Sequence, residues 1–335
     1  MEIHVNANEF RRRDKPAEVQ LETDMPVARV IEIDLEGAVI DPAVPFQHDP
    51  DGRLVYLLTG STPADATRRY RLESGPGVRP VEPLVTLVDG VEDEGQESYQ
   101  VITPGATWFY HKLGAGFSSL LDRDGLDWLS YRPGGGSAGE YRGIPNMGHP
   151  EGYCHPGKTV SHSRVVASGP LCVSIESASN DGVMRCRWDI FPYDARLTVL
   201  QMRTPYWFLY EGTPGGNPGG QLDEAGGYCA RSDGTRTPLS ERWDGPLPPP
   251  EWLYFGASNV DRALYLVHHE ADAEIDSYWP MEYNMTVFGF GRLGLDKFMT
   301  RVPAHFTVGF AEDGSLARAQ EVIDSAFRPL KIVIS

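Results

Sequence analysis

The chain has 335 residues, with 30 Lys and Arg against 47 Asp and Glu, which gives a net charge of −17 with His neutral. A surface this acidic repels phosphate groups, so nucleic acids and anionic membranes are excluded as expected partners. Glycine (36 residues) and proline (27 residues) are abundant. Turn residues at this density favour many short strands over a helix bundle.

No apolar run reaches the roughly 18 residues needed to cross a bilayer. The first residues show neither the basic nor the apolar part of a signal peptide. We therefore expect a cytoplasmic protein, or a mature form whose signal peptide has been removed. The cysteines form no CxxC motif, which predicts buried thiols in a reducing compartment; they are Cys154, Cys172, Cys186 and Cys229. The spacing is also compatible with a disulfide bond between Cys172 and Cys186, which it does not establish.

Short alternating segments fill the first 95 residues. Ile31, Ile33 and Leu35 alternate with acidic residues, which indicates a strand with one buried face. Further apolar or alternating segments at 54–58 and 67–72 are separated by turn residues. We expect a small N-terminal β-sandwich over residues 1–95.

Strands are predicted to continue over residues 96–335. A glycine-rich strand, an Asp-Gly turn and a second strand occupy 113–129. Further strands are expected at 165–177, 183–190, 197–203, 263–268 and 305–310. Long glycine- and proline-rich loops at 133–157, 213–227 and 245–250 are typical of functional segments. One helix is expected at 315–327, from its apolar stripe and the N-cap residue Ser315. The predicted fold class is all-β, with one C-terminal helix.

The hairpin at 113–129 resembles the opening hairpin of galactose-mutarotase-like β-supersandwich proteins, large antiparallel sandwiches whose concave sheet binds sugars. The whole chain also resembles uncharacterised bacterial proteins of polysaccharide-utilisation clusters, through the segments 140–146 (EYRGIPN), 209–216 (LYEGTPGG) and 265–270 (YLVHHE). The resemblance implies a β-supersandwich sugar-processing domain over 96–335. The Asn-His-x-Tyr-Phe motif of aldose mutarotases is missing, so mutarotation is not implied.

The densest polar cluster lies in the loop 133–157, among many glycines that let a ligand approach the backbone closely. It holds Glu140, Tyr141, Arg142, Asn146, His149, Tyr153, Cys154 and His155. The other interpretation of this cluster is a solvated loop whose His residues only bond their neighbours. Because sites tend to lie on loops carried by rigid sheets, we favour a site here.

Candidates outside this loop are fewer. His268 and His269 end an apolar strand, so their side chains point to opposite faces and only one can serve a site; we choose His268. Glu211 leaves an aromatic strand into a glycine-rich turn, where it is either an acid with a raised pKa or a turn cap. Weaker candidates are His111 and Lys112, which could bind the charged group of an anionic sugar, and Tyr210 and Trp279, which could stack on the faces of its pyranose rings.

No metal site and no cofactor are predicted. His149, Cys154, His155 and His268 could converge, but the spacing of the first His pair matches no established zinc pattern. Zinc or calcium therefore stays a minor alternative. The chain has no Walker A, G-x-G-x-x-G or G-x-S-x-G motif of the kind that indicates nucleotide binding or α/β-hydrolase chemistry. The oligomeric state is left open, a homo-oligomer included.

Three functions with a carbohydrate partner are compared. The favoured one is a lyase that cleaves a uronate-containing glycan by β-elimination. Arg142, Asn146 and His149 would neutralise the uronate carboxylate, and Tyr141 and His268 would exchange protons. The second is a glycoside hydrolase that uses Glu140 and Glu211 as paired carboxylates, with Asp223 and Glu270 in reserve. The third is a non-catalytic carbohydrate-binding protein. The lyase is favoured slightly, because His, Arg and Tyr dominate the loop.

Overall fold

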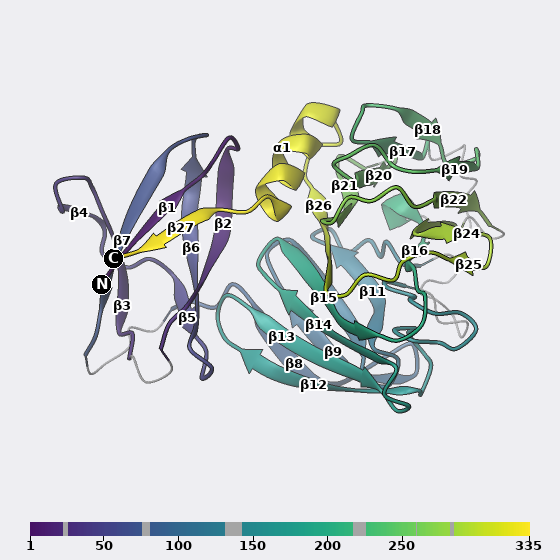
Figure 1. Cartoon of the computed structure of the whole chain (residues 1–335), viewed down its shortest axis with the longest axis horizontal. Coiled ribbons are helices and arrows are strands. Elements are labelled where there is room, and N and C mark those ends of the chain that lie inside the picture. The colour runs from purple at the N-terminus through teal and green to yellow at the C-terminus, as the bar shows by residue number, and fades with distance from the viewer. Residues whose placement is uncertain (23–25, 76–80, 131–142, 217–225, 259, 282–284) are drawn as a thin grey trace.

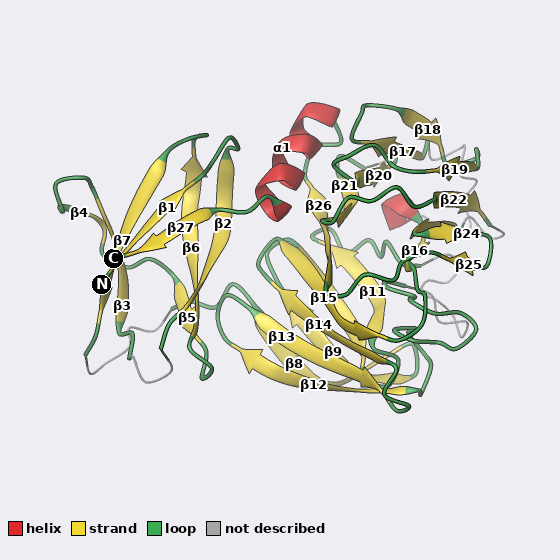
Figure 2. Cartoon of the chain, viewed as in Figure 1, coloured by secondary structure: helices red, strands yellow, loops and turns green. Residues whose placement is uncertain are grey.

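The computed structural model describes residues 1–22, 26–75, 81–130, 143–216, 226–258, 260–281 and 285–335. Strands make up most of these residues (Figure 2). They form a small sandwich and a large sandwich that lie side by side, with the helix α1 (Leu316–Phe327) between them (Figure 1). The predicted all-β class with a C-terminal helix is confirmed, and α1 is the one α-helix in the described part of the chain.

The small sandwich consists of two antiparallel sheets around a core of aliphatic residues and the rings of Phe46, Tyr56 and Tyr70. One sheet has the order β27 (Lys331–Ile334), β1 (Glu2–Asn6), β7 (Thr67–Glu73), β3 (Arg29–Ile33) and β4 (Val39–Asp41). The other has the order β2 (Arg12–Gln20), β6 (Arg53–Thr62) and β5 (Phe46–His48). Because β27 pairs with β1, the last strand of the chain belongs to the sheet that holds the first.

One face of the large sandwich is a nine-stranded antiparallel sheet. Its order is β12 (Ser161–Ser168), β13 (Val173–Ser179), β14 (Met184–Ile190), β15 (Asp194–Met202), β26 (Ala304–Ala311), β21 (Ala263–His268), β20 (Trp252–Gly256), β17 (Tyr228–Arg231) and β18 (Arg236–Pro238). The single strand expected at 165–177 is instead β12 and β13, because Gly169 and Pro170 reverse the chain between them.

Two four-stranded sheets form the opposite face. One has the order β11 (Gly116–Asp122), β10 (Ala106–His111), β9 (Gln96–Ile102) and β8 (Thr86–Asp93). The other has the order β16 (Phe208–Gly212), β23 (Thr286–Phe290), β22 (Asp276–Pro280) and β19 (Trp243–Gly245). Strand β8, which precedes the expected division at residue 95, pairs with β9, which follows it. The remaining elements are the short strands β24 (Arg292–Leu293) and β25 (Asp296–Lys297) and the 3-10 turn η1 (Pro214–Gly216).

The segment 143–147 joins these two four-stranded sheets. Ile144 exchanges backbone hydrogen bonds with Phe117 of β11 on one side. On the other side, the N–H groups of Leu209 and Glu211 in β16 donate to the carbonyls of Asn146 and Gly143. The two sheets therefore continue into one surface, and the core of the large sandwich is enclosed between this surface and the nine-stranded sheet.

Arg12 connects the small sandwich to the end of α1. It is fully buried, and its guanidinium donates to the carbonyls of Asp324 and Ser325 in the last turn of α1 at 3.0 and 3.3 Å. It also donates to the carbonyls of Ala7, Arg328 and Pro329. The last carbonyls of a helix have no hydrogen-bond donor within it and carry partial negative charge. The buried guanidinium of Arg12 supplies both the donors and a compensating positive charge.

An ionic network connects the small sandwich to the nine-stranded sheet. Arg53 of β6 lies 2.6 Å from Glu18 of β2 and 3.0 Å from Asp189 of β14. Arg196 of β15 pairs with the same Glu18 at 2.8 Å. A buried charge costs several kcal/mol unless it is paired, so these alternating charges favour one placement of the two sandwiches.

No helix in the described residues has the length and the apolar character that crossing a membrane would require.

We predict that Arg12→Leu lowers the free energy of unfolding by about 2–5 kcal/mol, because five carbonyls lose a buried donor. Urea denaturation measures the change. Arg164→Leu is the matched control, since the Arg164 side chain is 74% exposed and pairs only at the surface; it should stay within about 0.5 kcal/mol of wild type. Equal losses in the two variants would contradict the role given to Arg12.

Candidate functional site

Strand β16 places Glu211 on the outer surface of the sheet formed by β16 and β23. Side chains alternate along a strand, so Phe208 and Tyr210 enter the core while Leu209 and Glu211 face outward. Leu209 packs there with Trp207, Met285 and Val287. Glu211 is 3% exposed, so this carboxylate is almost fully covered.

Asn146 lies beside Glu211 because the segment 143–147 pairs with β16. The amide nitrogen of Asn146 donates to Glu211 Oε2 at 3.2 Å. Its amide oxygen is buried and accepts no hydrogen bond from any described residue. Buried polar atoms without a partner are uncommon and need an explanation.

Arg292, which follows the turn at Gly291, contributes the positive charge of this surface. Its side chain lies 5.7 Å from the ring centre of Trp207 and 4.7 Å from that of Trp279. Burial lowers the pKa of Arg292, whereas Glu211 and Asp244 favour its charged form. Its Nη1 atom is buried and donates to no described group. We call Asn146, Trp207, Glu211, Trp279 and Arg292 the Glu211 cluster.

The edge of the Glu211 cluster carries more charge. Trp279 is half-buried; its indole N–H donates to Asp244 at 3.0 Å, and Arg242 lies 3.8 Å from its ring centre. Lys297 lies 4.9 Å from the ring centre of Trp207 and 3.6 Å from Glu151. The cluster thus combines one buried carboxylate, one amide, cations and two indoles. Guanidinium groups bind carboxylates well, and amide and carboxylate groups bind hydroxyls.

His268 ends β21 in the nine-stranded sheet, and its side chain points into the sandwich. Its ring stacks on Phe306 at 5.0 Å, and its Nδ1 is 2.6 Å from Glu251 Oε2. Glu270 pairs with His305 at 2.5 Å and lies 3.8 Å from Nε2 of His268. Because Glu211 faces outward from the opposite, four-stranded sheet, the structure does not bring His268 and Glu211 together.

Glu251, His268 and Asp272 are the one group of potential metal ligands in the described ranges, with atoms that lie within 4.8 Å of one another. The Nδ1 atom of His268 already bonds Glu251, and Asp272 lies 4.0 Å from the same atom. Of the four potential metal ligands considered from the sequence, which are His149, Cys154, His155 and His268, only His268 belongs to this group. Cys154 contacts Cys186 and Met184 in the core, and His149 is exposed.

The remaining sequence candidates are dispersed. His111 is buried and accepts a hydrogen bond from the N–H of Gly157, while Lys112 contacts Asp89 and Glu97, both at 2.5 Å. His155 lies 2.9 Å from the carbonyl of Pro156. Tyr210 is in the core, where its hydroxyl donates to the carbonyl of Trp128 at 2.8 Å. Glu140, Tyr141, Arg142 and Asp223 lie outside the described residues. Asn146, Glu211 and Trp279 are therefore the predicted residues that the structure groups in the Glu211 cluster.

Sequence reasoning missed Arg292. The available signal was Gly289 inside an apolar strand; in the structure a Cβ there would lie 2.4 Å from Leu209 and 2.9 Å from Arg292, so these side chains would have to move. A glycine inside a strand indicates a close approach of this kind.

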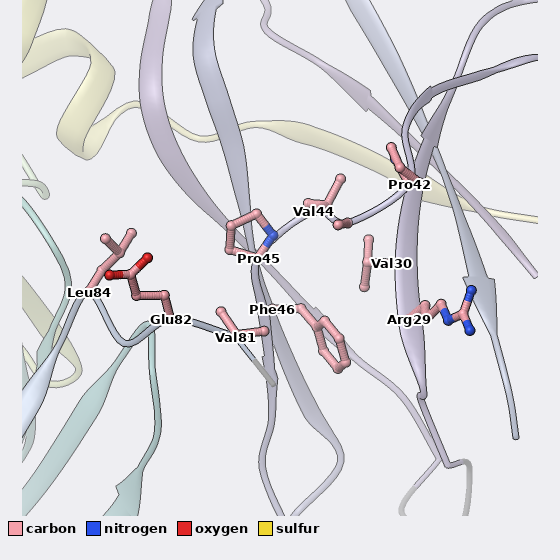
Figure 3. Close-up of a pocket in the computed structure, with 10 residues that line it drawn as sticks. Arg29, Val30, Pro42, Val44, Pro45, Phe46, Val81, Glu82 and Leu84 are labelled. Carbon is pink, nitrogen blue, oxygen red and sulfur yellow. The ribbon is translucent and has the colours of Figure 1, made fainter. Parts of the chain in front are cut away.

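A cavity beside the small sandwich is lined by none of the predicted site residues. It has a volume of about 320 Å³ and lies between β3, the segment 42–46 and the linker residues 81–84. Figure 3 shows Val30, Val44, Phe46 and Val81 around this space, whereas the guanidinium of Arg29 points away from it.

No protein-family model matches this chain, and no curated protein matches it. Among solved structures, one described as the crystal structure of HI1317 has 13% sequence identity and a TM-score of 0.44, and the match covers 69% of this chain and 97% of that one. The galactosidase domain of the α-galactosidase–sucrose kinase AgaSK has 9% identity and a TM-score of 0.37, with 68% of this chain and 42% of that one covered. Both likenesses are too distant to assign an activity.

His269 faces α1, opposite to His268, as strand alternation requires. Its ring meets Phe327 edge-on at 5.5 Å, and its Nε2 is 2.8 Å from Thr307 Oγ1. Burial lowers the pKa of His269 from 6.5 to about 3, and Glu270 opposes this shift. The folded protein therefore holds His269 neutral.

A neutral His269 makes stability fall in acid. The unfolded chain takes up a proton below about pH 6.5 that the folded chain refuses until about pH 3, so the free energy of unfolding decreases as the pH falls through this window. One proton corresponds to about 1.4 kcal/mol per pH unit. We expect His269→Gln to flatten this decline between about pH 6 and pH 4, as measured by urea denaturation. The exposed His162 gives the control, His162→Gln, with the wild-type slope. An unchanged slope in His269→Gln would contradict the assignment.

Proposed function

We propose that this protein binds a carbohydrate that carries a carboxylate group, and cleaves it by β-elimination, at the Glu211 cluster. The observation that supports this best is Arg292, a buried guanidinium with an unpartnered Nη1 between two indole rings. A buried N–H donor without an acceptor is costly. A uronate carboxylate would supply the acceptor, and indole faces are suited to pyranose rings.

The proposed elimination depends on neutralising the negative charge of the uronate carboxylate. The C5 proton of a uronate becomes acidic when its carboxylate is neutralised, and Arg292 and the amide of Asn146 are the groups for this task. Glu211 would take the C5 proton, because it is the carboxylate beside Asn146. The electron pair then forms the C4–C5 double bond as the C4–oxygen bond breaks. The leaving oxygen takes a proton from Tyr141, which stays a sequence prediction, or from water.

Arg292→Gln should lower kcat/KM on uronate glycans about 10- to 100-fold, because a charge-assisted bond is lost. The assay incubates wild type and variants with uronate and neutral polysaccharides and follows both the ultraviolet absorbance of the unsaturated product and new reducing ends. Arg242→Gln is the matched control, since Arg242 contacts the same Trp279 but its side chain is 52% exposed. A wild-type rate in Arg292→Gln, with an unchanged melting temperature, would remove Arg292 from substrate binding.

Glu211→Gln should reduce kcat far more than it changes KM, since the amide keeps the shape but cannot accept the C5 proton. We expect a loss of at least about 100-fold in kcat, in the range of a removed general base. Glu176→Gln, a surface change in β13, is the control. Reducing ends without ultraviolet absorbance would contradict elimination and indicate a hydrolase. Binding without either product would indicate a carbohydrate-binding protein.

A further inference from the structure

Two cysteine side chains meet in the core of the large sandwich. Cys154 lies in the loop segment that follows Asn146, and Cys186 lies in β14 of the nine-stranded sheet. Both residues are fully buried, and their sulfur atoms are 3.5 Å apart although the residues are 32 positions apart in the sequence. A disulfide bond is about 2.0 Å long, so the sulfur atoms would have to approach by about 1.5 Å. Small rotations about the two Cα–Cβ bonds supply a movement of this size.

The other two cysteines are not placed to bond with this pair. Cys172 packs with Leu57 and Phe191 at the contact with the small sandwich, whereas Cys186 points into the core on the other face of the sheet. The structure therefore does not bring Cys172 and Cys186 together, because side chains on opposite faces of a sheet cannot meet. Cys229 lies in β17, which four strands separate from β14. At about 4.8 Å per strand, this separation corresponds to about 24 Å.

The backbone at Cys154 adopts an unusual conformation. Its φ is 47°, in the left-handed region that residues other than glycine, asparagine and aspartate rarely adopt. A residue stays in this region only when the surrounding structure fixes it there. The printed contacts of the Cys154 sulfur are the sulfur atoms of Cys186 and of Met184, at 3.5 and 3.6 Å. The fold thus directs the Cys154 side chain toward β14.

We propose that Cys154 and Cys186 form a disulfide bond when the chain folds in the presence of a low-molecular-weight disulfide. One cysteine thiolate attacks the external disulfide, which gives a mixed disulfide and releases one external thiol. The other cysteine thiolate then attacks the protein sulfur of the mixed disulfide, so that the Cys154–Cys186 bond forms and the second external thiol leaves. Two cysteine thiols are oxidised, one external disulfide is reduced, and the two protons from the cysteines end on the released thiols.

The reaction belongs to the folding of the chain, because both sulfur atoms are covered in the folded protein. Burial also raises the pKa of the Cys154 thiol, and the thiolate is the form that attacks a disulfide. We therefore expect the folded, reduced protein to oxidise slowly. The folded, oxidised protein should resist external thiols, because they cannot reach the bond.

The bond would hold the segment that joins the two four-stranded sheets. Cys154 follows Asn146 in this segment, whose backbone pairs with β16, and Cys186 belongs to the nine-stranded sheet on the opposite face. The crosslink would therefore connect the two faces of the large sandwich through its core. It would also restrict the unfolded chain, which is the main way in which a disulfide stabilises a protein. This inference does not depend on the elimination proposed for the Glu211 cluster.

Refolding of the full chain under two conditions tests the proposal. The protein is unfolded and reduced, and is then refolded either with a mixture of reduced and oxidised glutathione or with dithiothreitol. After both samples are unfolded in guanidinium chloride, we expect the first to lose two of the four thiols of the chain and the second to keep all four. Mass spectrometry of unreduced peptides should show the peptide of Cys154 joined to that of Cys186. Four thiols in both samples, glutathione adducts in place of the bond, or a bond that includes Cys172 or Cys229 would overturn the proposal.

Variants test the effect of the bond on stability. Oxidised wild type should unfold at a higher urea concentration than reduced wild type, because the crosslink restricts the unfolded chain. Cys154→Ala should abolish this difference and keep its three thiols under both refolding conditions. Cys172→Ala is the matched control, since Cys172 is also fully buried, and it should keep the difference. A difference that persists in Cys154→Ala, or that is lost in Cys172→Ala, would contradict the assignment of the bond.

Discussion

The alternation of side chains along each strand decides which residues of this protein can share a site. Tyr210 and Glu211 are neighbours in β16, yet the phenol enters the core and the carboxylate faces outward. His268 and His269 are divided in the same way, one against Phe306 and the other against α1. A sequence rich in short strands therefore distributes a dense group of polar residues over several surfaces, however close they are along the chain. Exceptions need a local change of backbone, such as the bulge at Asp14.

Contacts between distant segments then hold these surfaces in place. Arg12 and Lys15 of β2 both donate to carbonyls at the end of α1, so the small sandwich stabilises the helix end electrostatically. On the other side of the interface, Arg53 joins Glu18 to Asp189. Each of these charges would be costly if it were buried alone, which makes the joint arrangement specific. Together these two sets of contacts favour one placement of β2, α1 and the nine-stranded sheet.

Local patterns and long-range pairing differ in how well the sequence reveals them. The all-β class and the helix at 316–327 follow from turn density and a 3.6-residue apolar period, both of which are local. The position of Asn146 beside Glu211 depends on the segment 143–147 pairing with β11 and β16, which no local pattern encodes. Site residues that lie on one loop can be proposed from sequence, whereas residues joined by sheet order require the structure.

Unpartnered buried polar atoms are informative here only when they have polar neighbours. The indoles of Trp108, Trp188 and Trp252 also lack partners, but Trp108 and Trp188 pack against Phe117 in the core, as large apolar side chains do. The unpartnered atoms of Asn146 and Arg292 are different, because a carboxylate and further cations lie around them. Leaving such a group unpaired costs about 1–3 kcal/mol. A chain that leaves two of them together at one surface gives up stability there, and a ligand that pairs with both recovers it.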